Sequence, residues 1–301
     1  MIELMIEALI VIGLCIFGAA LGSFAAATVW RLRAAQLAAD AARGEKIART
    51  DTLEVEKLTR HKRSVTTDRS VCLHCGHQLR WYELLPVISW VIQGGKCRHC
   101  KRPIGSMEIL AEVLLGVAFG LSYVLWPYGF STDQGIVFFV LWLLILTALA
   151  IHWMYDARWF LLLDKVTIFL LVVAILFVAL KLAGQSSLLL TQSLIGLGLT
   201  LVALPGFYGL LYIVSRGAWI GLGDVKLLVP FALMLPSWES GILLIFLANL
   251  IGCLVLLPGM LTKKLTRTTR VPFGPFLILA FIVTFLCGQR ILDFYFGTIL
   301  F

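Results

Sequence analysis

The chain alternates long apolar runs with short polar connections, and eight of the runs are candidate membrane helices. A helix needs about 20 apolar residues to cross the hydrocarbon core of a bilayer. The runs cover residues 4–30, 107–126, 135–155, 166–182, 188–214, 225–235, 241–261 and 273–297. The sixth run is the shortest, since eleven residues rise only about 16 Å as a helix. The pattern predicts an all-α polytopic membrane protein with about eight transmembrane helices.

Basic residues predict how these helices are oriented. With the N-terminus outside and eight crossings, 15 of the 25 Lys and Arg residues fall in residues 31–106, and eight more fall in other loops on that side. Only Lys181 and Arg290 face the opposite side. Cytoplasmic loops of membrane proteins carry the excess of Lys and Arg. We therefore expect both termini outside and three regions: a first transmembrane helix (1–31), a cytoplasmic domain (32–106) and a membrane core with seven further helices (107–301).

Composition agrees with a membrane location. The chain is 60% hydrophobic and 14% charged, whereas soluble domains carry about 25% charged residues. The net charge of +8 is explained by the basic loops, so we expect the lipid bilayer as a partner and no nucleic acid. The first apolar run is too long for a signal peptide, which predicts a retained helix.

Two Cys-x-x-Cys pairs mark the polar region between the first two runs. Each pair can form a turn that offers two thiolates, and two such turns complete a tetrahedral zinc site. The ligands would be Cys72, Cys75, Cys97 and Cys100. A closed four-thiolate site is structural, so we expect Zn²⁺ to stabilise a small zinc-ribbon-like domain. A redox pair and a degenerate site without metal are the alternatives. Residues 34–69 are rich in alanine and charge, which indicates one amphipathic helical stretch.

Two aspartates border apolar runs on the predicted cytoplasmic side. Asp156 ends the third run, and Asp224 opens the sixth. Ionisable groups beside membrane spans are costly and are candidates for function. Two carboxylates brought together can share a proton and act as base and acid. The alternative is that each merely caps a helix.

Other polar groups in or near the apolar runs carry weaker expectations. Glu108 and Glu112 lie four residues apart, so both can point into the bundle. Asp164 is a candidate N-cap, while His152 and Lys181 are more typical of packed or snorkelling side chains. The glycine-rich residues 221–223 leave two alternatives open: non-helical backbone lining a cavity, or an ordinary loop before a short tilted helix.

Several motifs, in order along nearly the whole chain, resemble the type IV prepilin peptidases. Gly221-Leu222-Gly223-Asp224-Val225-Lys226 is similar to the GxGD signature of membrane aspartic peptidases. The other matching segments are Gly22-Ser23-Phe24, Trp30-Arg31-Leu32, the two cysteine pairs, Arg80-Trp81-Tyr82, Pro86-Val87-Ile88-Ser89-Trp90 and Val271-Pro272-Phe273-Gly274-Pro275-Phe276.

The resemblance implies an aspartic endopeptidase of the bacterial inner membrane that uses no metal for its chemistry. Such enzymes cleave the leader from prepilins or pseudopilins of type IV pili or type II secretion, at the cytoplasmic face. Many members also methylate the new N-terminus with S-adenosylmethionine. On this resemblance the catalytic pair would be Asp156 and Asp224.

The chain departs from the family pattern at two places. Arg158 and Leu163-Asp164 stand where a second acidic residue and Pro-Asp are common, which leaves the role of Asp164 open. Ala25-Ala26-Ala27 lack an asparagine that is common in the opening motif, which leaves methyl transfer open. A proton-coupled transporter, a non-catalytic zinc-ribbon adaptor and a methyltransferase acting alone are the rival functions.

Overall fold

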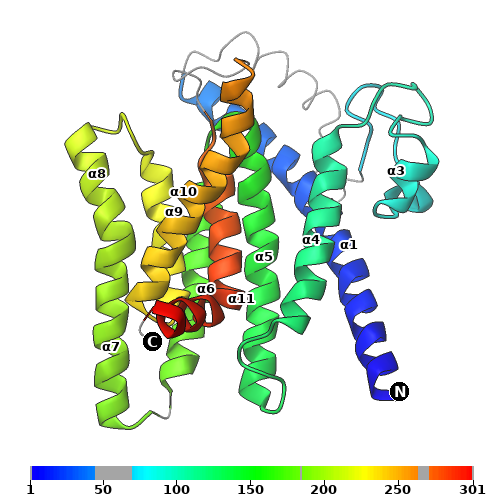
Figure 1. The fold of residues 1–301 in the computed structure, drawn as a ribbon. Coiled ribbons are helices and arrows are strands. Elements are labelled where there is room, and N and C mark those ends of the chain that lie inside the picture. Colours follow the sequence, from blue (N-terminus) through cyan, green and yellow to red (C-terminus); the bar gives the residue numbers. More distant parts are fainter. Residues whose placement is uncertain (1, 45–69, 184, 264–270, 300–301) are drawn as a thin grey trace. The chain divides into compact units, whose positions relative to one another are not determined.

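The computed structural model (Figure 1) describes residues 2–44, 70–183, 185–263 and 271–299. Within these ranges the secondary structure is helical, apart from two isolated β-bridges, Val71–Gln78 and Lys96–Pro103. The predicted helical stretch 34–69 is helical to Ala42, and its residues 45–69 lie outside the described ranges. The chain divides into two compact units, Met1–Val124 and Leu125–Phe301.

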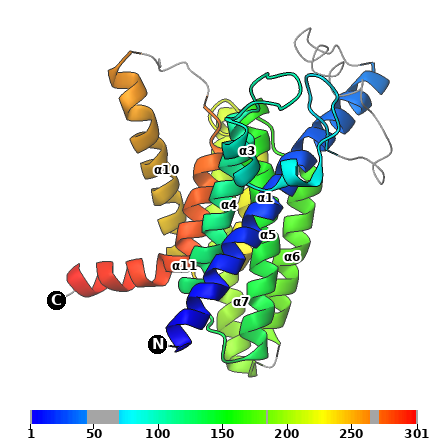
Figure 2. The ribbon, with the colours of Figure 1, turned by 90° about the vertical axis from the view of Figure 1, so that its right-hand side faces the viewer.

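The first unit is built on two closely packed helices, α1 (Ile2–Ala42) and α4 (Ser106–Val124) (Figure 2). Glycines allow the backbones of the two helices to come close together. A β-carbon built on Gly22 would lie 2.6 Å from the carbonyl oxygen of Ala111, and one on Gly116 would lie 2.8 Å from that of Cys15. Small residues allow helix backbones to come this close in membranes. The short helices η1 (Trp81–Leu84) and α3 (Ile88–Ile92) belong to the segment between α1 and α4.

The second unit is a helix bundle around an aromatic core. Its helices are α5 (Asp133–Trp159), α6 (Asp164–Leu182), α7 (Ser187–Leu201), η2 (Val202–Gly206), α8 (Phe207–Ser215), α9 (Leu222–Met234), α10 (Trp238–Leu261) and α11 (Gly274–Ile299). The rings of Phe231 and Phe281 stack with centroids 3.9 Å apart, and Trp142 stacks on Phe285 at 4.1 Å. Large side chains from α5, α9 and α11 thus form one buried layer.

Seven helical elements of the described chain are long and apolar enough to cross a membrane. They match seven of the eight predicted runs; α7, η2 and α8 follow one another without a break and form the single element Ser187–Ser215. The sixth run forms α9, whose 13 residues rise about 20 Å. The predicted class, an all-helical membrane protein with a small four-cysteine region, is confirmed, with seven helices of membrane-spanning length where about eight were expected. Since α9 begins at Leu222 with Gly221 as its N-cap, Leu222 and Gly223 already belong to the short helix, which is closer to the second alternative than to non-helical backbone.

Candidate active site and metal centre

Asp156 lies near the C-terminal end of α5 and is buried, with 6% of its surface exposed. Its Oδ2 accepts a hydrogen bond of 3.0 Å from the backbone amide of Gly274, the first residue of α11. The first amides of a helix have no partner within that helix and suit an anion. The Val271–Phe276 motif, 118 residues further along the chain, therefore reaches Asp156 through this amide.

Position 274 has no room for a side chain unless the Asp156 carboxylate shifts. A β-carbon built there would lie 2.6 Å from Asp156 Oδ2, well inside ordinary contact distance. The sequence marked this glycine as part of a motif without revealing its partner. The structure shows that its missing side chain makes room for the carboxylate.

Asp224 lies in the first turn of α9, where its amide bonds the carbonyl of Gly221 at 3.2 Å. Its Oδ2 would be 3.3 Å from a β-carbon on Gly221, so the carboxylate folds back over that glycine. Gly223 faces the side chain of Leu162, in the connection between α5 and α6. Gly221 thus makes room for the Asp224 carboxylate, and Gly223 makes room for Leu162.

The carboxylates of Asp156 and Asp224 are close enough for their charges to interact, although 68 residues separate them in sequence. The C-terminal end of α5 and the N-terminal ends of α9 and α11 bring Asp156, Asp224 and Gly274 together. Tyr208 of α8 adds a hydroxyl that sequence reasoning missed. It is 3% exposed and lies within electrostatic range of Asp224. Its position in an apolar run offered no signal of this.

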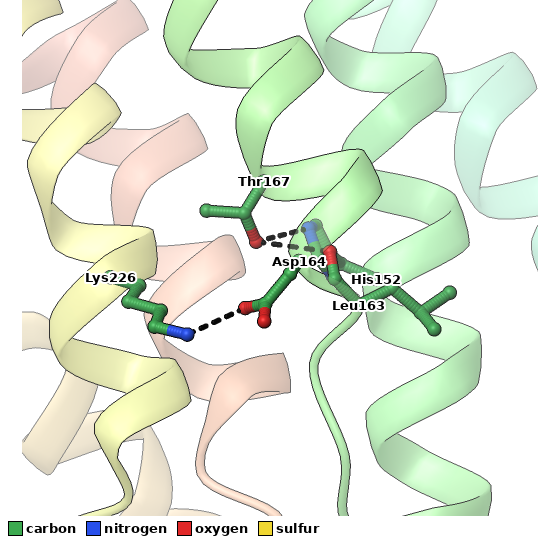
Figure 3. Close-up of polar contacts among 5 residues, drawn as sticks. All are labelled: His152, Leu163, Asp164, Thr167 and Lys226. Atoms are coloured by element: carbon green, nitrogen blue, oxygen red, sulfur yellow. Dashed lines mark hydrogen bonds and ion pairs between the residues drawn. The ribbon is translucent and has the colours of Figure 1, made fainter. Parts of the chain in front are cut away.

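Asp164 has a partner other than the aspartate pair. It begins α6, and its Oδ1 accepts a hydrogen bond of 2.8 Å from Lys226 Nζ, two residues after Asp224 (Figure 3). Both side chains are exposed, 66% for Asp164 and 45% for Lys226. The ion pair joins the first turns of α6 and α9.

His152 lies one turn before Asp156 on α5 and is fully buried. Its Nε2 is 3.2 Å from the Thr167 hydroxyl, which also donates to the carbonyl of Leu163 (Figure 3). This contact joins α5 to α6. It fits the expectation that His152 is a packed side chain.

The four predicted cysteine ligands converge in the first unit. Their sulfur atoms all lie within 4.8 Å of one another, and those of Cys72 and Cys100 are 3.9 Å apart. Tetrahedral Zn–S bonds of about 2.3 Å place sulfurs roughly 3.8 Å apart, so the donor set and spacing fit a metal ion. Each pair lies in a turn closed by a backbone bond, from Gly76 to Cys72 and from Lys101 to Cys97.

Glu108 and Glu112 bind neighbouring segments of the first unit. Glu108 Oε1 accepts from the Trp30 indole at 3.2 Å, and Glu112 Oε2 accepts from the Val87 amide at 2.8 Å. The two glutamates therefore connect α4 to α1 and to the segment between the cysteine pairs.

Together these features define a polytopic membrane protein with a carboxylate pair at helix ends and a four-cysteine centre. Two family models match the chain: the bacterial peptidase A24 N-terminal domain over residues 16–126, and the type IV leader peptidase family over residues 137–257. The chain is 32% identical to the prepilin leader peptidase/N-methyltransferase of Stutzerimonas stutzeri, over 74% of this chain and 73% of that protein.

Two further relatives are similarly close. The Pseudomonas aeruginosa prepilin leader peptidase/N-methyltransferase is 30% identical over 74% of this chain and 72% of its own length. The type 4 prepilin-like proteins leader peptide-processing enzyme of Escherichia coli is 31% identical over 74% and 77%. No solved structure matches the chain significantly. The chain belongs to the type IV leader peptidase family, as the resemblance of its motifs predicted.

Proposed function

We propose that this protein is an aspartic endopeptidase that removes the leader peptide from type IV prepilins or pseudopilins. The observation that carries the proposal is the convergence of Asp156 and Asp224 beside the N-terminal amide of α11. Family membership supports the same activity, since the relatives are named for it. A transporter or an adaptor gives no reason for each carboxylate to have a glycine beside it, Gly274 at Asp156 and Gly221 at Asp224.

The proposed chemistry uses the two carboxylates as a unit. One takes a proton from a water molecule that attacks the scissile carbonyl carbon, while the other, protonated, donates to the carbonyl oxygen. As the tetrahedral intermediate collapses and its C–N bond breaks, the first carboxyl gives its proton to the leaving amine, and a hydroxyl of the intermediate returns a proton to the second carboxylate. The Gly274 amide keeps Asp156 oriented throughout. Titration belongs to the pair rather than to either residue.

The substrate and its approach follow from the position of the pair. It lies where α5 ends and α9 begins, so a peptide bond at the end of a membrane helix can reach it. Basic loops flank these ends of the helices in the sequence, which supports a cytoplasmic placement by the positive-inside rule. We therefore place the site and the four-cysteine region at the cytoplasmic face of the bacterial inner membrane.

The four-cysteine centre would hold Zn²⁺ through Cys72, Cys75, Cys97 and Cys100. Four thiolates complete a tetrahedron and leave no open position for a substrate. The ion would supply folding energy to a segment with little core of its own, so its task in the proposal is structural.

N-methylation with S-adenosylmethionine is the second activity in the names of the relatives. We include it as a second candidate for this chain but assign no residues to it. It is tested separately, by transfer of a labelled methyl group to the new N-terminus of a cleaved substrate. The cleavage proposal does not depend on its outcome.

The test of cleavage compares the purified chain with D224N and D156N on a prepilin in detergent. We expect both variants to lose cleavage by at least about 10³-fold while keeping their metal content. The matched control is D133N, because Asp133 is an exposed aspartate at the opposite end of α5. Full cleavage by D156N or D224N would refute the assignment of the pair.

A further inference from the structure

The segment between the two cysteine pairs exposes several large apolar side chains. In α3, Ile88, Val91 and Ile92 have the i, i+3, i+4 spacing that places them on one helix face, and they are 56%, 62% and 71% exposed. In η1, Trp81 is 76% exposed and shares a face with Leu84, three residues later. We call Trp81, Leu84, Leu85, Ile88, Val91 and Ile92 the apolar patch.

The exposed charged side chains of residues 70–105 have one sign. Residues 70–105 contain a single acidic residue, Glu83, which is buried and accepts the amide hydrogen of Arg80 at 2.8 Å. The same residues contain five cations: Arg80, Lys96, Arg98, Lys101 and Arg102. Exposed apolar side chains combined with unopposed cations are the composition that binds an anionic membrane interface.

A hydrogen bond fixes the depth of the apolar patch along the membrane helix α4. The Val87 amide, between Leu85 and Ile88, donates to Glu112, which lies six residues after the start of α4 and so about 9 Å along it. All 19 residues of α4 span about 28 Å, no more than the roughly 30 Å hydrocarbon core. Val87 is therefore held at or below the level where α4 enters the hydrocarbon.

The backbone at Val87 is strained in a way that serves this attachment. Its φ of 60° and ψ of −50° are unusual for a β-branched residue, and the amide of Ile88 bonds the carbonyl of Pro86. The tight turn points the Val87 amide at Glu112 and starts α3 beside α4. Such strain persists only where surrounding contacts hold it.

We propose that the apolar patch is a membrane-interface anchor that inserts between anionic lipid headgroups beside α1 and α4. The apolar side chains enter the upper acyl region, and the cations lie among the phosphates. Glu112 is the positioning residue that sets the depth. The anchor keeps the four-cysteine region against the bilayer, and it does not depend on the proposed peptidase activity.

The experiment uses the full-length protein, labelled with 5-fluorotryptophan, in nanodiscs of phosphatidylcholine with or without phosphatidylglycerol. W81F identifies the fluorine resonance of Trp81. We expect a nitroxide on the lipid acyl chain to broaden this resonance and a water-soluble gadolinium chelate to leave it sharp. I88E should abolish the broadening by the nitroxide. S89E is the matched control, because it adds the same negative charge one residue further along α3, outside the face that carries the exposed apolar side chains.

Two results would overturn the proposal. Broadening of Trp81 by the soluble chelate and not by the nitroxide would mean that the patch faces water and is open to a protein partner. Equal broadening by the nitroxide with and without phosphatidylglycerol would mean that insertion of the patch does not require anionic lipid.

Discussion

Replacing Gly274 with alanine is expected to slow peptide cleavage about 100-fold while leaving the protein folded. The added β-carbon would lie 2.6 Å from Asp156 Oδ2, whereas ordinary contact begins at 3.4 Å. The carboxylate must therefore retreat by about 0.8 Å, and displacements of about 1 Å in a catalytic group can cost 10²-fold. The backbone amide that donates to Asp156 remains in the variant, so the effect is steric.

The assay is steady-state cleavage of a prepilin in detergent, with kcat and KM measured separately. The loss should appear in kcat, because Asp156 acts on the peptide bond rather than on the remote parts of the substrate. G297A is the matched control in the same helix, since a β-carbon at Gly297 meets nothing within 4 Å. A G274A protein with the thermal stability and the kcat of the wild type would refute the reasoning.

Three further predictions concern the ion pair, the metal and the helix pair of the first unit. D164K and K226D should each slow cleavage by no more than about fivefold, because exposed ion pairs contribute at most about 1 kcal/mol, and the double exchange should recover part of the loss. C97S should abolish the single equivalent of zinc that we expect by elemental analysis, and should lower the stability of the four-cysteine region in hydrogen exchange. G22L should destabilise the α1–α4 packing by about 1–3 kcal/mol, measured by thermal denaturation in detergent, whereas G13L should not, since Gly13 has nothing within 4 Å.

Each of these has a result that would contradict it. A double exchange of Asp164 and Lys226 that is slower than both single variants would mean that the pair does not act through its charges. Zinc retained at full stoichiometry in C97S would place the metal elsewhere. A G22L protein as stable as G13L would mean that α1 and α4 do not rely on the contact between Gly22 and Ala111.

Family membership was predictable because its marks are local in sequence. The cysteine pairs carry their own spacing, and GxGD is a run of four residues whose first glycine makes room for the aspartate. Membrane helices are equally local, since each one satisfies its own backbone hydrogen bonds. The seven long spans therefore follow from the apolar runs.

What the sequence by itself determined is the inventory: an all-helical membrane chain, two thiolate pairs and two aspartates at the ends of apolar runs. The tertiary structure decided which of these meet. It brings Asp156 to the amide of Gly274 and within electrostatic range of Asp224. It also pairs Asp164 with Lys226. It also turns Glu112 toward Val87. Such pairings join residues 25 to 118 positions apart, and no local pattern encodes them, because they depend on which helix ends pack together and how closely small residues let them approach.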